Sequence, residues 1–406
     1  MKSIIKYILI VLIVKGYSLN AQQESNIQKL DAMIVQGMND WKVPGLAAIV
    51  VKDGNVIFQK TYGVKNVQTK EPVNESTLFA LASTTKAIIA LSLGMLVDVG
   101  KLKWDDKVIE HLPYFRLSDP YITANARVKD LLTHNLGIGN ADLLWFIDST
   151  STRQTLRNFQ NAKKAYPIRG GFTYQNIMYV AAGEVIGAAS GKHWTDFVKE
   201  RVFIPLEMNR TQAKAINILK AGNYVTPYNY DPEEGIVKVP HSFADQIGAA
   251  GMIWSAPKDI CNYLTFLTNE GVYKNDTLVK PTTFNYLFKP HALQPEGGIY
   301  PTTALTKPNW NTYGLGWFQQ DYRGSKLDFH TGSLGGLVAI VGVLHDKNMA
   351  VYVFANLDHA ELRHAIMLKA IDLFVFNDDN RDWHAEVFEL YNGINKKNLE
   401  KQKKES

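Results

Sequence analysis

The chain has 406 residues, 46% of them hydrophobic, and a single cysteine, Cys261. One cysteine excludes an internal disulfide, and a chain of this length can bury a core large enough to fold without one. The formal charge of +5 includes three lysines and no acidic residue within residues 1–21, so the remainder carries +5 − 3 = +2. This near balance gives no reason to expect nucleic acid or an anionic membrane as a partner.

The N-terminus has the pattern of an export signal. Lys2 and Lys6 precede an apolar run over residues 7–14, and the segment Ser18-Leu19-Asn20-Ala21 precedes a polar sequence. We predict a secretory signal peptide over residues 1–21, with cleavage after Ala21. The run is too short to span a bilayer, and no other stretch approaches the roughly 20 apolar residues that a membrane helix needs. We therefore expect a soluble, exported protein, periplasmic or secreted, without stable membrane insertion after signal removal.

Two hairpins frame the rest of the chain. Apolar strands over residues 45–51 and 56–62 flank an Asp-Gly turn, and a second pair over 336–344 and 349–356 flanks a polar turn. The region between them is mainly helical and punctuated by prolines. Strands at both ends with helices between them predict an α+β fold (an α/β sandwich), in which helices flank one antiparallel sheet.

The same reading predicts the domain organisation. We expect one domain over residues 22–376, with a helical subdomain inserted at about 116–239. The remaining residues, 377–406, are rich in both signs of charge and predict a charged C-terminal helix or tail. The sequence leaves the oligomeric state open.

A serine and a lysine stand three residues apart at the start of a long apolar segment. Ser83 directly precedes a predicted helix over residues 84–99, and Lys86 lies in its first turn. This helix is apolar nearly all round, which is typical of a buried helix. Residues i and i+3 share a helix face, so Lys86 Nζ can reach Ser83 Oγ. A lysine in a dry environment loses its charge readily and can then take the proton of a serine hydroxyl.

The spacing alone is not specific, because it occurs three times in the chain. Ser3 and Lys6 lie in the predicted leader. Ser255, which precedes Lys258 and stands just before an Ala-Pro pair, is interpreted as an ordinary helix N-cap. Any function of Ser83 and Lys86 therefore depends on the motifs that follow them in the chain.

A second motif places Tyr174 and Asn176 between a Gly-Gly pair and an apolar helix over 177–186. A tight loop before a helix aims such a tyrosine at one point, and a phenol near an ammonium group ionises more easily and can shuttle a proton. The alternative is a buried tyrosine bonded to the backbone. Tyr273 and Asn275 repeat the same spacing, so this motif too is weak by itself.

The third motif, His330-Thr331-Gly332 followed by Ser333, occurs once, just before the last hairpin. We predict an edge strand whose free backbone N–H groups can bind a substrate or an oxyanion. A plain glycine-rich turn is the alternative.

In this order, the three motifs resemble those of the serine β-lactamase and penicillin-binding protein superfamily. The nearest branch is that of class C β-lactamases, D,D-carboxypeptidases, D-aminopeptidases and related esterases, and the resemblance covers about residues 26–376. It includes three further segments: Leu-Leu-Thr-His-Asn at 131–135, Gly-Ala-Ala-Gly-Met at 248–252 and Tyr-Gly-Leu-Gly-Trp at 313–317. A β-lactamase/transpeptidase-like fold is what this resemblance implies.

The resemblance also implies roles for single residues. Ser83 would be the nucleophile, Lys86 its proton partner and Tyr174 the general base or acid. Asn176 would contact the substrate amide and Lys86, and His330 would lie beside the substrate. The backbone N–H groups of Ser83 and Ser333 would form the oxyanion hole, whereas His134 would belong to a structural turn without a chemical role.

His330 departs from the family pattern, because true β-lactamases and most penicillin-binding proteins carry lysine there. A permanent cation at this place holds a substrate carboxylate, whereas a histidine is mostly neutral near pH 7. Histidine here resembles the esterase and aminopeptidase members and puts β-lactam hydrolysis in doubt.

We therefore expect an exported serine hydrolase that forms an acyl-enzyme and cleaves an ester or a peptide amide, including bonds to D-amino acids, in a small-molecule or peptide substrate. No cofactor is implied, and the ten histidines form no metal-binding motif. One alternative is a penicillin-binding D,D-carboxypeptidase or weak β-lactamase. Another is a catalytically inert penicillin-binding sensor or binding module.

Overall fold

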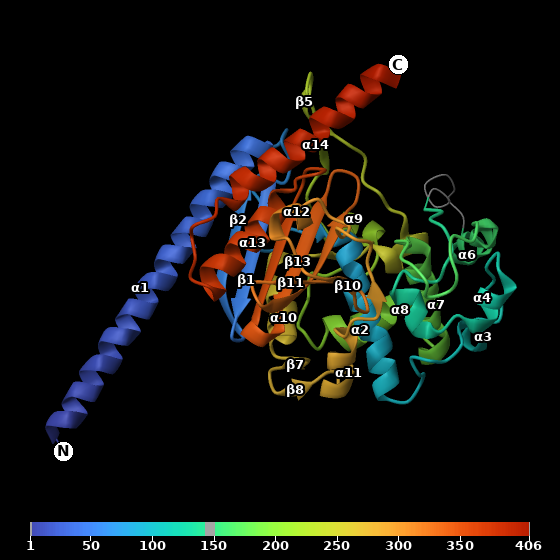
Figure 1. The fold of residues 1–406 in the computed structure, drawn as a ribbon, viewed down its shortest axis with the longest axis horizontal. Helices are drawn as coiled ribbons and strands as arrows, with labels where there is room; N and C mark the ends of the chain where they lie inside the picture. Colours follow the sequence, from blue (N-terminus) through green and yellow to red (C-terminus); the bar gives the residue numbers. More distant parts are fainter. Residues whose placement is uncertain (1, 143–150, 406) are drawn as a thin grey trace.

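An eight-stranded antiparallel sheet organises the protein, in a computed structural model that describes residues 2–142 and 151–405. The strand order is β2-β1-β14-β13-β12-β11-β10-β9, and helices cover both faces (Figure 1). The strands are β1 (Gly45–Lys52), β2 (Asn55–Gly63), β9 (Ala292–Leu293), β10 (Asn311–Tyr313), β11 (Phe318–Tyr322), β12 (Ser325–Ser333), β13 (Val338–Leu344) and β14 (Met349–Ala355).

The two predicted hairpins lie side by side in this sheet. Strand β1 pairs with β2 on one side and with β14 on the other, where Leu46 faces Ala355. Because side chains alternate along a strand, Ile49 packs into the core on one face and Val50 into the core on the other. Both faces are therefore apolar, and the predicted antiparallel sheet flanked by helices is confirmed.

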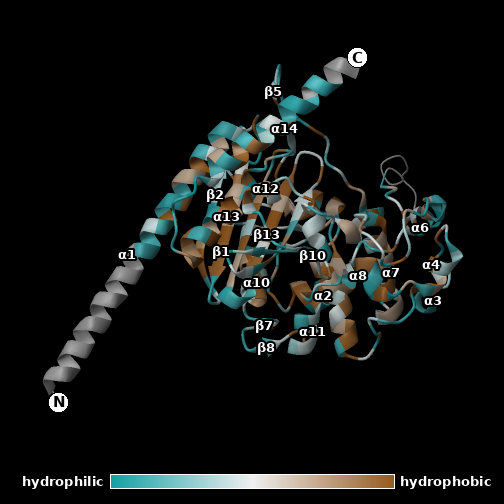
Figure 2. Ribbon diagram, in the orientation of Figure 1, coloured by the Kyte–Doolittle hydropathy of each residue, from teal (hydrophilic) through white to brown (hydrophobic). Residues whose placement is uncertain are grey.

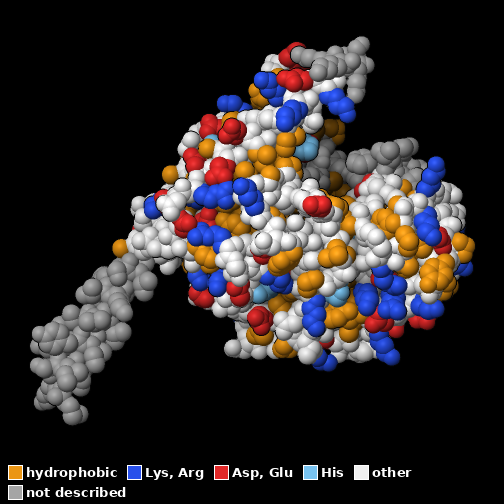
Figure 3. Space-filling model, viewed as in Figure 1, with side chains coloured by type: hydrophobic (Ala, Val, Ile, Leu, Met, Phe, Trp, Pro, Cys, Tyr) orange, Lys and Arg blue, Asp and Glu red, His pale blue; other side chains and the backbone are white. Residues whose placement is uncertain are grey.

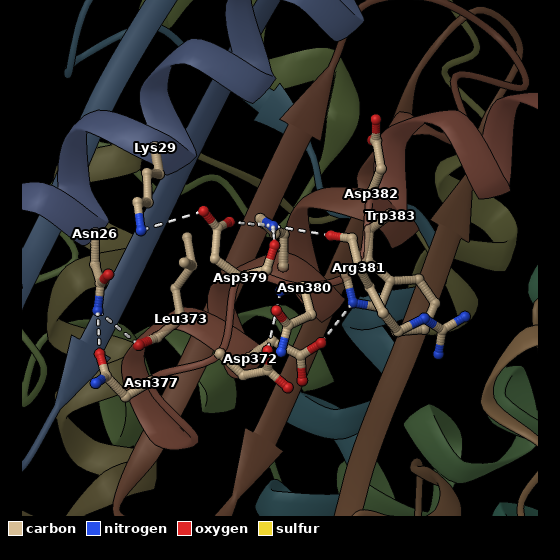
Figure 4. Close-up of polar contacts among 12 residues, drawn as sticks. Asn26, Lys29, Asp372, Leu373, Asn377, Asp379, Asn380, Arg381, Asp382 and Trp383 are labelled. Atoms are coloured by element: carbon tan, nitrogen blue, oxygen red, sulfur yellow. Dashed lines mark hydrogen bonds and ion pairs between the residues drawn. The ribbon is translucent and has the colours of Figure 1, made fainter.

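One face of the sheet carries the two terminal helices and α13 (Leu362–Val375). Helix α1 (Lys2–Trp41) buries Leu30 here, and α14 (Trp383–Glu405) buries Trp383. Figure 4 shows the polar contacts that tie these helices together. Asn26 Nδ2 donates to the carbonyl of Leu373 at 2.8 Å, and the Trp383 indole N–H donates to Asp372 Oδ2 at 2.7 Å. The charged C-terminal segment thus includes a helix whose first turn packs against the core.

The opposite face carries the helices that lead to the site. Helices α2 (Thr85–Asp98), α7 (Asn176–Ser190) and α10 (Pro257–Thr268) all contribute to the core on this face. Figure 2 shows hydrophobic residues concentrated in the sheet and in the helices beside it. On the face drawn in Figure 3, acidic and basic side chains are interspersed.

Shorter elements connect and extend these layers. The helices are α3 (Val108–His111), α4 (Pro120–Asn125), α6 (Thr152–Asn158), α8 (Trp194–Val198), α9 (Ile218–Ala221), α11 (Pro281–Leu287) and α12 (Thr303–Thr306). Three two-stranded pairs join β3 (Phe79–Ala80) to β6 (Trp254–Ser255), β4 (Tyr228–Asp231) to β5 (Gly235–Lys238), and β7 (Val272–Tyr273) to β8 (Asp276–Thr277).

The structure corrects one local prediction and leaves two others untested. Ser255 is not a helix cap: it lies in β6, and Ala256 is the residue that precedes Pro257 at the start of α10. The side chains of residues 1–20 lie outside the described residues, so the signal peptide stays a prediction, as does the inserted subdomain at 116–239. Within the described residues, no helix combines the length and hydropathy needed to cross a bilayer.

Candidate active site

A strained turn presents Ser83 at the start of α2. The chain leaves β3 and forms one 3-10 turn, Ala82–Thr84, before α2 begins at Thr85. Ala82 has a φ of 46°, a left-handed conformation that is uncommon for residues other than glycine and that often marks a functional site. Ser83 is partly exposed, whereas Ala82 and Thr84 are buried. The turn therefore makes a hydroxyl accessible at the edge of a buried helix.

Gly332 of β12 lets the sheet approach this turn closely. A Cβ atom at position 332 would lie 2.4 Å from the carbonyl oxygen of Leu81 and 2.9 Å from the backbone nitrogen of Ser83. No side chain fits in that space, so glycine is required for the contact. The backbone N–H of Ser83 belongs to the first turn of a helix, where such donors have no partner within the helix.

The strand that makes this contact differs in one respect from the prediction. β12 is not an edge strand, because it pairs with β11 and β13. Its pairing with β11 ends at Phe329, however, so the His330–Ser333 half has no β11 partner. The backbone groups of that half that face away from β13 therefore have no partner in β11, and they lie beside Ser83.

Lys86 is fully buried and contacts three oxygen atoms. Its Nζ lies 3.0 Å from Ser83 Oγ, 2.7 Å from Asn176 Oδ1 and 2.7 Å from the carbonyl oxygen of Ala250. Burial lowers the pKa of Lys86 to about 7, although the charge of Asp142 opposes part of this shift. A large fraction of Lys86 is therefore uncharged at neutral pH.

The identity of these three partners determines where the Lys86 lone pair points. A neutral amine has two N–H bonds and one lone pair. Asn176 Oδ1 and the Ala250 carbonyl can only accept, so they take the two N–H bonds. Ser83 is the one partner with a hydrogen to donate, so the lone pair faces its hydroxyl at 3.0 Å. This is the arrangement that a general base needs.

Asn176 is held in turn by an acidic residue that the sequence reasoning missed. Asn176 Nδ2 donates to Asp142 Oδ2 at 2.8 Å, and the Asn176 backbone N–H donates to Asp142 Oδ1 at 3.3 Å. The two residues are 34 positions apart, and Asp142 belongs to no motif. Its only signal in the sequence is an acidic side chain shortly after a glycine-containing loop, which does not identify a partner.

Tyr174 lies beside the nucleophile, but its ionisation differs from the prediction. The phenol is hydrogen-bonded to Ser83, and the Lys86 ammonium lies 5.1 Å from the Tyr174 ring centre. The expectation that a nearby ammonium makes this phenol easier to ionise is wrong: burial raises its pKa well above the usual value. Tyr174 is therefore a neutral hydroxyl that can donate a hydrogen bond or a proton.

His134 supports the loop that carries Tyr174. The backbone N–H of Gln175 donates to His134 Nδ1 at 3.1 Å, and the Thr173 N–H donates to the His134 carbonyl at 2.8 Å. Burial, with the neighbouring Lys86, holds the pKa of His134 well below its usual range. These contacts are those of a residue that shapes a turn.

His330 is buried and neutral, as expected for a histidine at this position near pH 7. It has no exposed surface, and its Nε2 lies 3.0 Å from the Tyr313 hydroxyl. Its Nδ1 lies 2.6 Å from the Thr331 carbonyl, so Nδ1 carries the hydrogen and Nε2 accepts from Tyr313. Burial lowers the pKa of His330 to about 3. In this conformation the ring supports Tyr313 and is not presented to a substrate.

A permanent cation does lie near the end of β12, but it is already paired. Arg363 of α13 is buried, and its Nη1 donates to Ser333 Oγ and to the Ala339 carbonyl, both at 3.2 Å. Its Nε lies 3.1 Å from Glu361 Oε2, and the two residues form a buried ion pair. The sequence reasoning missed this pair because α13 is otherwise a largely apolar helix.

The structure thus brings Ser83, Lys86, Tyr174 and Asn176 together around one point. Ser333, which is exposed, directly follows the glycine that touches the Ser83 turn, whereas His330 is fully buried and hydrogen-bonded to Tyr313. Among the described residues, no group of three or more His, Cys, Asp or Glu side chains is placed to hold a metal ion.

This fold, with a serine and a buried lysine at the start of α2, places the protein in the serine β-lactamase and penicillin-binding protein superfamily. The family model described as Beta-lactamase matches residues 30–375, and the chain belongs to that family.

This chain is similar to several known proteins over most of its length. The octameric penicillin-binding protein homologue from Pyrococcus abyssi superimposes with a TM-score of 0.76 and 26% identity, over 86% of this chain and 77% of that one. Unguisins hydrolase ungD' of Aspergillus campestris is 26% identical over 88% of this chain and 67% of its own length. Protein flp of Staphylococcus aureus is 25% identical over 82% and 63%, respectively. The chain therefore spans about two thirds of the length of these two curated relatives.

Proposed function

We propose that the protein is an exported serine hydrolase that forms an acyl-enzyme on Ser83 and cleaves an ester or a peptide amide. The observation that carries this proposal is the contact between Lys86 Nζ and Ser83 Oγ at 3.0 Å, with the other two Lys86 partners able only to accept. A lysine pKa of about 7 allows this base to work near neutral pH. The leader pattern of residues 1–21 supports export.

In the proposed reaction, Ser83 Oγ attacks the carbonyl carbon while its proton passes to Lys86 Nζ. The backbone N–H groups of Ser83 and Ser333 stabilise the negative charge on the carbonyl oxygen. The carbon–oxygen or carbon–nitrogen bond of the substrate then breaks, and the leaving group takes a proton from Lys86 directly or through the Tyr174 hydroxyl. Water repeats these steps on the acyl-enzyme, which releases the acid and restores the serine.

The charges around the site favour substrates without a carboxylate next to the scissile bond. His330 is neutral, and Arg363 is buried and paired with Glu361. Neither offers a free cation to hold the carboxylate of a penicillin or of a D-alanine terminus. This supports an esterase or an aminopeptidase activity, including bonds to D-amino acids, over a D,D-carboxypeptidase or β-lactamase activity.

The test is a substrate profile of the purified protein with intact-mass detection of the acyl-enzyme. Short-chain p-nitrophenyl esters, D-amino-acid p-nitroanilides, a labelled penicillin and a chromogenic cephalosporin would be compared, with Ser83→Ala as the control. We expect turnover of an ester or anilide that requires Ser83. A stable penicillin adduct without turnover of any substrate would instead identify a binding protein, and preferential cephalosporin hydrolysis would identify a β-lactamase.

A further inference from the structure

The orientation of the Asn176 amide controls the direction of the Lys86 lone pair. With Oδ1 toward Lys86, the amide takes one amine hydrogen and leaves the lone pair for Ser83. A flipped amide would turn an N–H toward Lys86, and the lone pair would then face Asn176 instead of the serine. Because an asparagine side chain can adopt either orientation, something outside the Ser83–Lys86–Asn176 group has to select one.

Asp142 is the residue placed to make this selection. A carboxylate can only accept hydrogen bonds, so its contact at 2.8 Å requires the Nδ2 group of Asn176 to face it. Its other oxygen accepts the Asn176 backbone N–H, so both ends of Asn176 are tied to the same side chain. Within the described residues, no lysine, arginine or histidine pairs with Asp142. Its carboxylate is therefore committed to Asn176 and to Asn140, whose Nδ2 donates at 3.2 Å.

We propose that Asp142 is a positioning residue of the hydrolase, which holds the Asn176 amide with its oxygen on Lys86 and thereby directs the Lys86 lone pair to Ser83. The inference rests on the proposed function, since it assigns Lys86 the role of base. Asp142 touches neither Lys86 nor Ser83 and acts through Asn176. Nothing in the sequence connects these four residues in this order.

The same carboxylate acts on the charge of Lys86. Five titratable groups lie around Lys86: Tyr174, Tyr179, His134, His330 and Asp142. Burial raises the pKa of both tyrosines and lowers the pKa of both histidines, so these four groups stay neutral near pH 7. Asp142 stabilises the protonated amine and raises the pKa of Lys86. Removal of the Asp142 charge therefore lowers the pKa of Lys86. Lys86 then stays neutral to lower pH, so the acidic limb of the activity profile moves to lower pH.

The experiment measures the reaction of Ser83 with a fluorophosphonate, read by intact mass between pH 5 and 9. In this reaction the serine oxygen bonds to phosphorus, fluoride leaves, and Lys86 takes the proton, so no knowledge of the natural substrate is needed. The variants are Asp142→Asn, Asp142→Glu, Asn176→Ala and the double variant Asp142→Asn/Asn176→Ala. Asp119→Asn is the matched control, because Asp119 caps α4 and asparagine is an equally good cap.

We expect Asp142→Asn to lower the plateau rate by about 10- to 100-fold, as for a lost hydrogen bond to a charged group, and to shift the acidic limb to lower pH. Asp142→Glu should leave the acidic limb at the wild-type pH, because the negative charge remains. It should lower the plateau rate, because the carboxylate oxygens move. In the Asn176→Ala background, Asp142→Asn should have little further effect on the plateau rate, since its route to Lys86 is already absent.

Three results would overturn the inference while leaving the proposed function intact. The first is an Asp142→Asn enzyme that reacts with the wild-type plateau rate and pH profile, and the second is a double variant in which the two losses of rate add fully. A lower melting temperature with an unchanged pH profile would likewise assign Asp142 to loop structure only. A wild-type protein that does not react would overturn the proposed function and this inference with it. If Asp142→Asn does not fold, Asp142→Glu and Asn176→Ala decide between these outcomes through their plateau rates.

Discussion

Two neighbouring segments of this protein carry a serine and a lysine three residues apart, and they behave in opposite ways. Ser83 is partly exposed at the end of a strained turn, and Lys86 behind it is fully buried. Ser255 is fully buried in β6, where its Oγ lies 2.8 Å from Thr211 Oγ1, and Lys258 is exposed. The two segments adjoin each other, because β3, which leads to Ser83, pairs with β6.

The comparison indicates that burial, rather than spacing, distinguishes the serine–lysine pair that we propose to be reactive from the one that is not. A reactive pair needs an accessible hydroxyl and a lysine that has lost much of its charge, and the Ser83 segment meets both conditions. The Ser255 segment reverses them, with a buried hydroxyl that is already hydrogen-bonded and a solvated ammonium. The predictions below use the second pair as the control for the first.

The largest expected effect is that of Ser83→Ala. Removal of the nucleophile should lower kcat/KM by about 10⁴-fold or more, as for the loss of a catalytic serine in other hydrolases. The fold should persist, because the side chain loses one oxygen at a partly exposed position. Hydrolysis of the best ester in the substrate profile, with the melting temperature as a control, measures both. Retention of more than a trace of activity would show that another residue is the nucleophile.

Ser255→Ala should leave kcat/KM unchanged and lower the free energy of unfolding by about 1 kcal/mol, since one buried hydrogen bond to Thr211 is lost. Chemical denaturation measures this difference. A large loss of activity in this variant, at unchanged stability, would contradict the contrast between the two segments.

Lys86→Arg should be nearly as damaging as Lys86→Ala, with a loss of about 10²- to 10⁴-fold in kcat, because a guanidinium stays protonated and cannot take the serine proton. Lys258→Arg should have no effect, since Lys258 is exposed. Single-turnover acylation rates of both arginine variants test this. An active Lys86→Arg enzyme would mean that position 86 supplies positive charge alone.

The wild-type enzyme should lose activity as the pH falls through about 7. The base works when Lys86 is neutral, and its pKa is about 7, so kcat/KM should drop about tenfold per pH unit below that value. Tyr174 and His330 should not contribute limbs between pH 5 and 9, because burial moves both pKa values out of that range. A pH profile with a neutral ester measures the limb, and constant activity down to pH 5 would argue against Lys86 as the base.

The smallest expected effect concerns substrate charge. The pKa of His330 is about 3, so it should gain no charge above pH 5, and the ratio of penicillin to neutral-ester acylation rates should stay constant within about twofold from pH 5 to 8. An increase in the acylation rate for penicillin, but not for the neutral ester, as the pH falls would show that His330 becomes charged and binds the substrate carboxylate.

The sheet was predictable because its signals are local. An Asp-Gly turn between apolar strands specifies the β1–β2 hairpin, and the continuous apolar runs of β13 and β14 specify strands buried on both faces. The capping role given to Ser255 was wrong for a related reason. Serine before Ala-Pro is a good local signal for a cap, but the pairing of β6 with β3, a contact between distant segments, placed that serine in a strand.

The candidate site was predictable only in part. The sequence motifs predict Ser83, Lys86, Tyr174 and Asn176 as site residues. In the structure these four side chains lie close together. Asp142 was not predicted because no periodicity or motif links it to Asn176, and its proposed role depends on two hydrogen bonds between a loop and the first residue of α7. The charge state of Tyr174 was misjudged because the desolvation of a buried phenol outweighs a neighbouring lysine that is itself only partly charged.

The sequence by itself determined which residues can meet over short range: the serine and lysine on one helix turn and the strands of each hairpin. The close approach of Gly332 in β12 to Ser83 joins distant segments and belongs to the tertiary structure. Only the tertiary structure decided their chemistry. Whether Lys86 is a base, whether His330 is charged and which way Asn176 faces all depend on solvent exclusion and on partners far away in the chain. Those quantities are set when the helices close over the sheet, because the dielectric environment and the available hydrogen-bond partners exist only in the packed molecule.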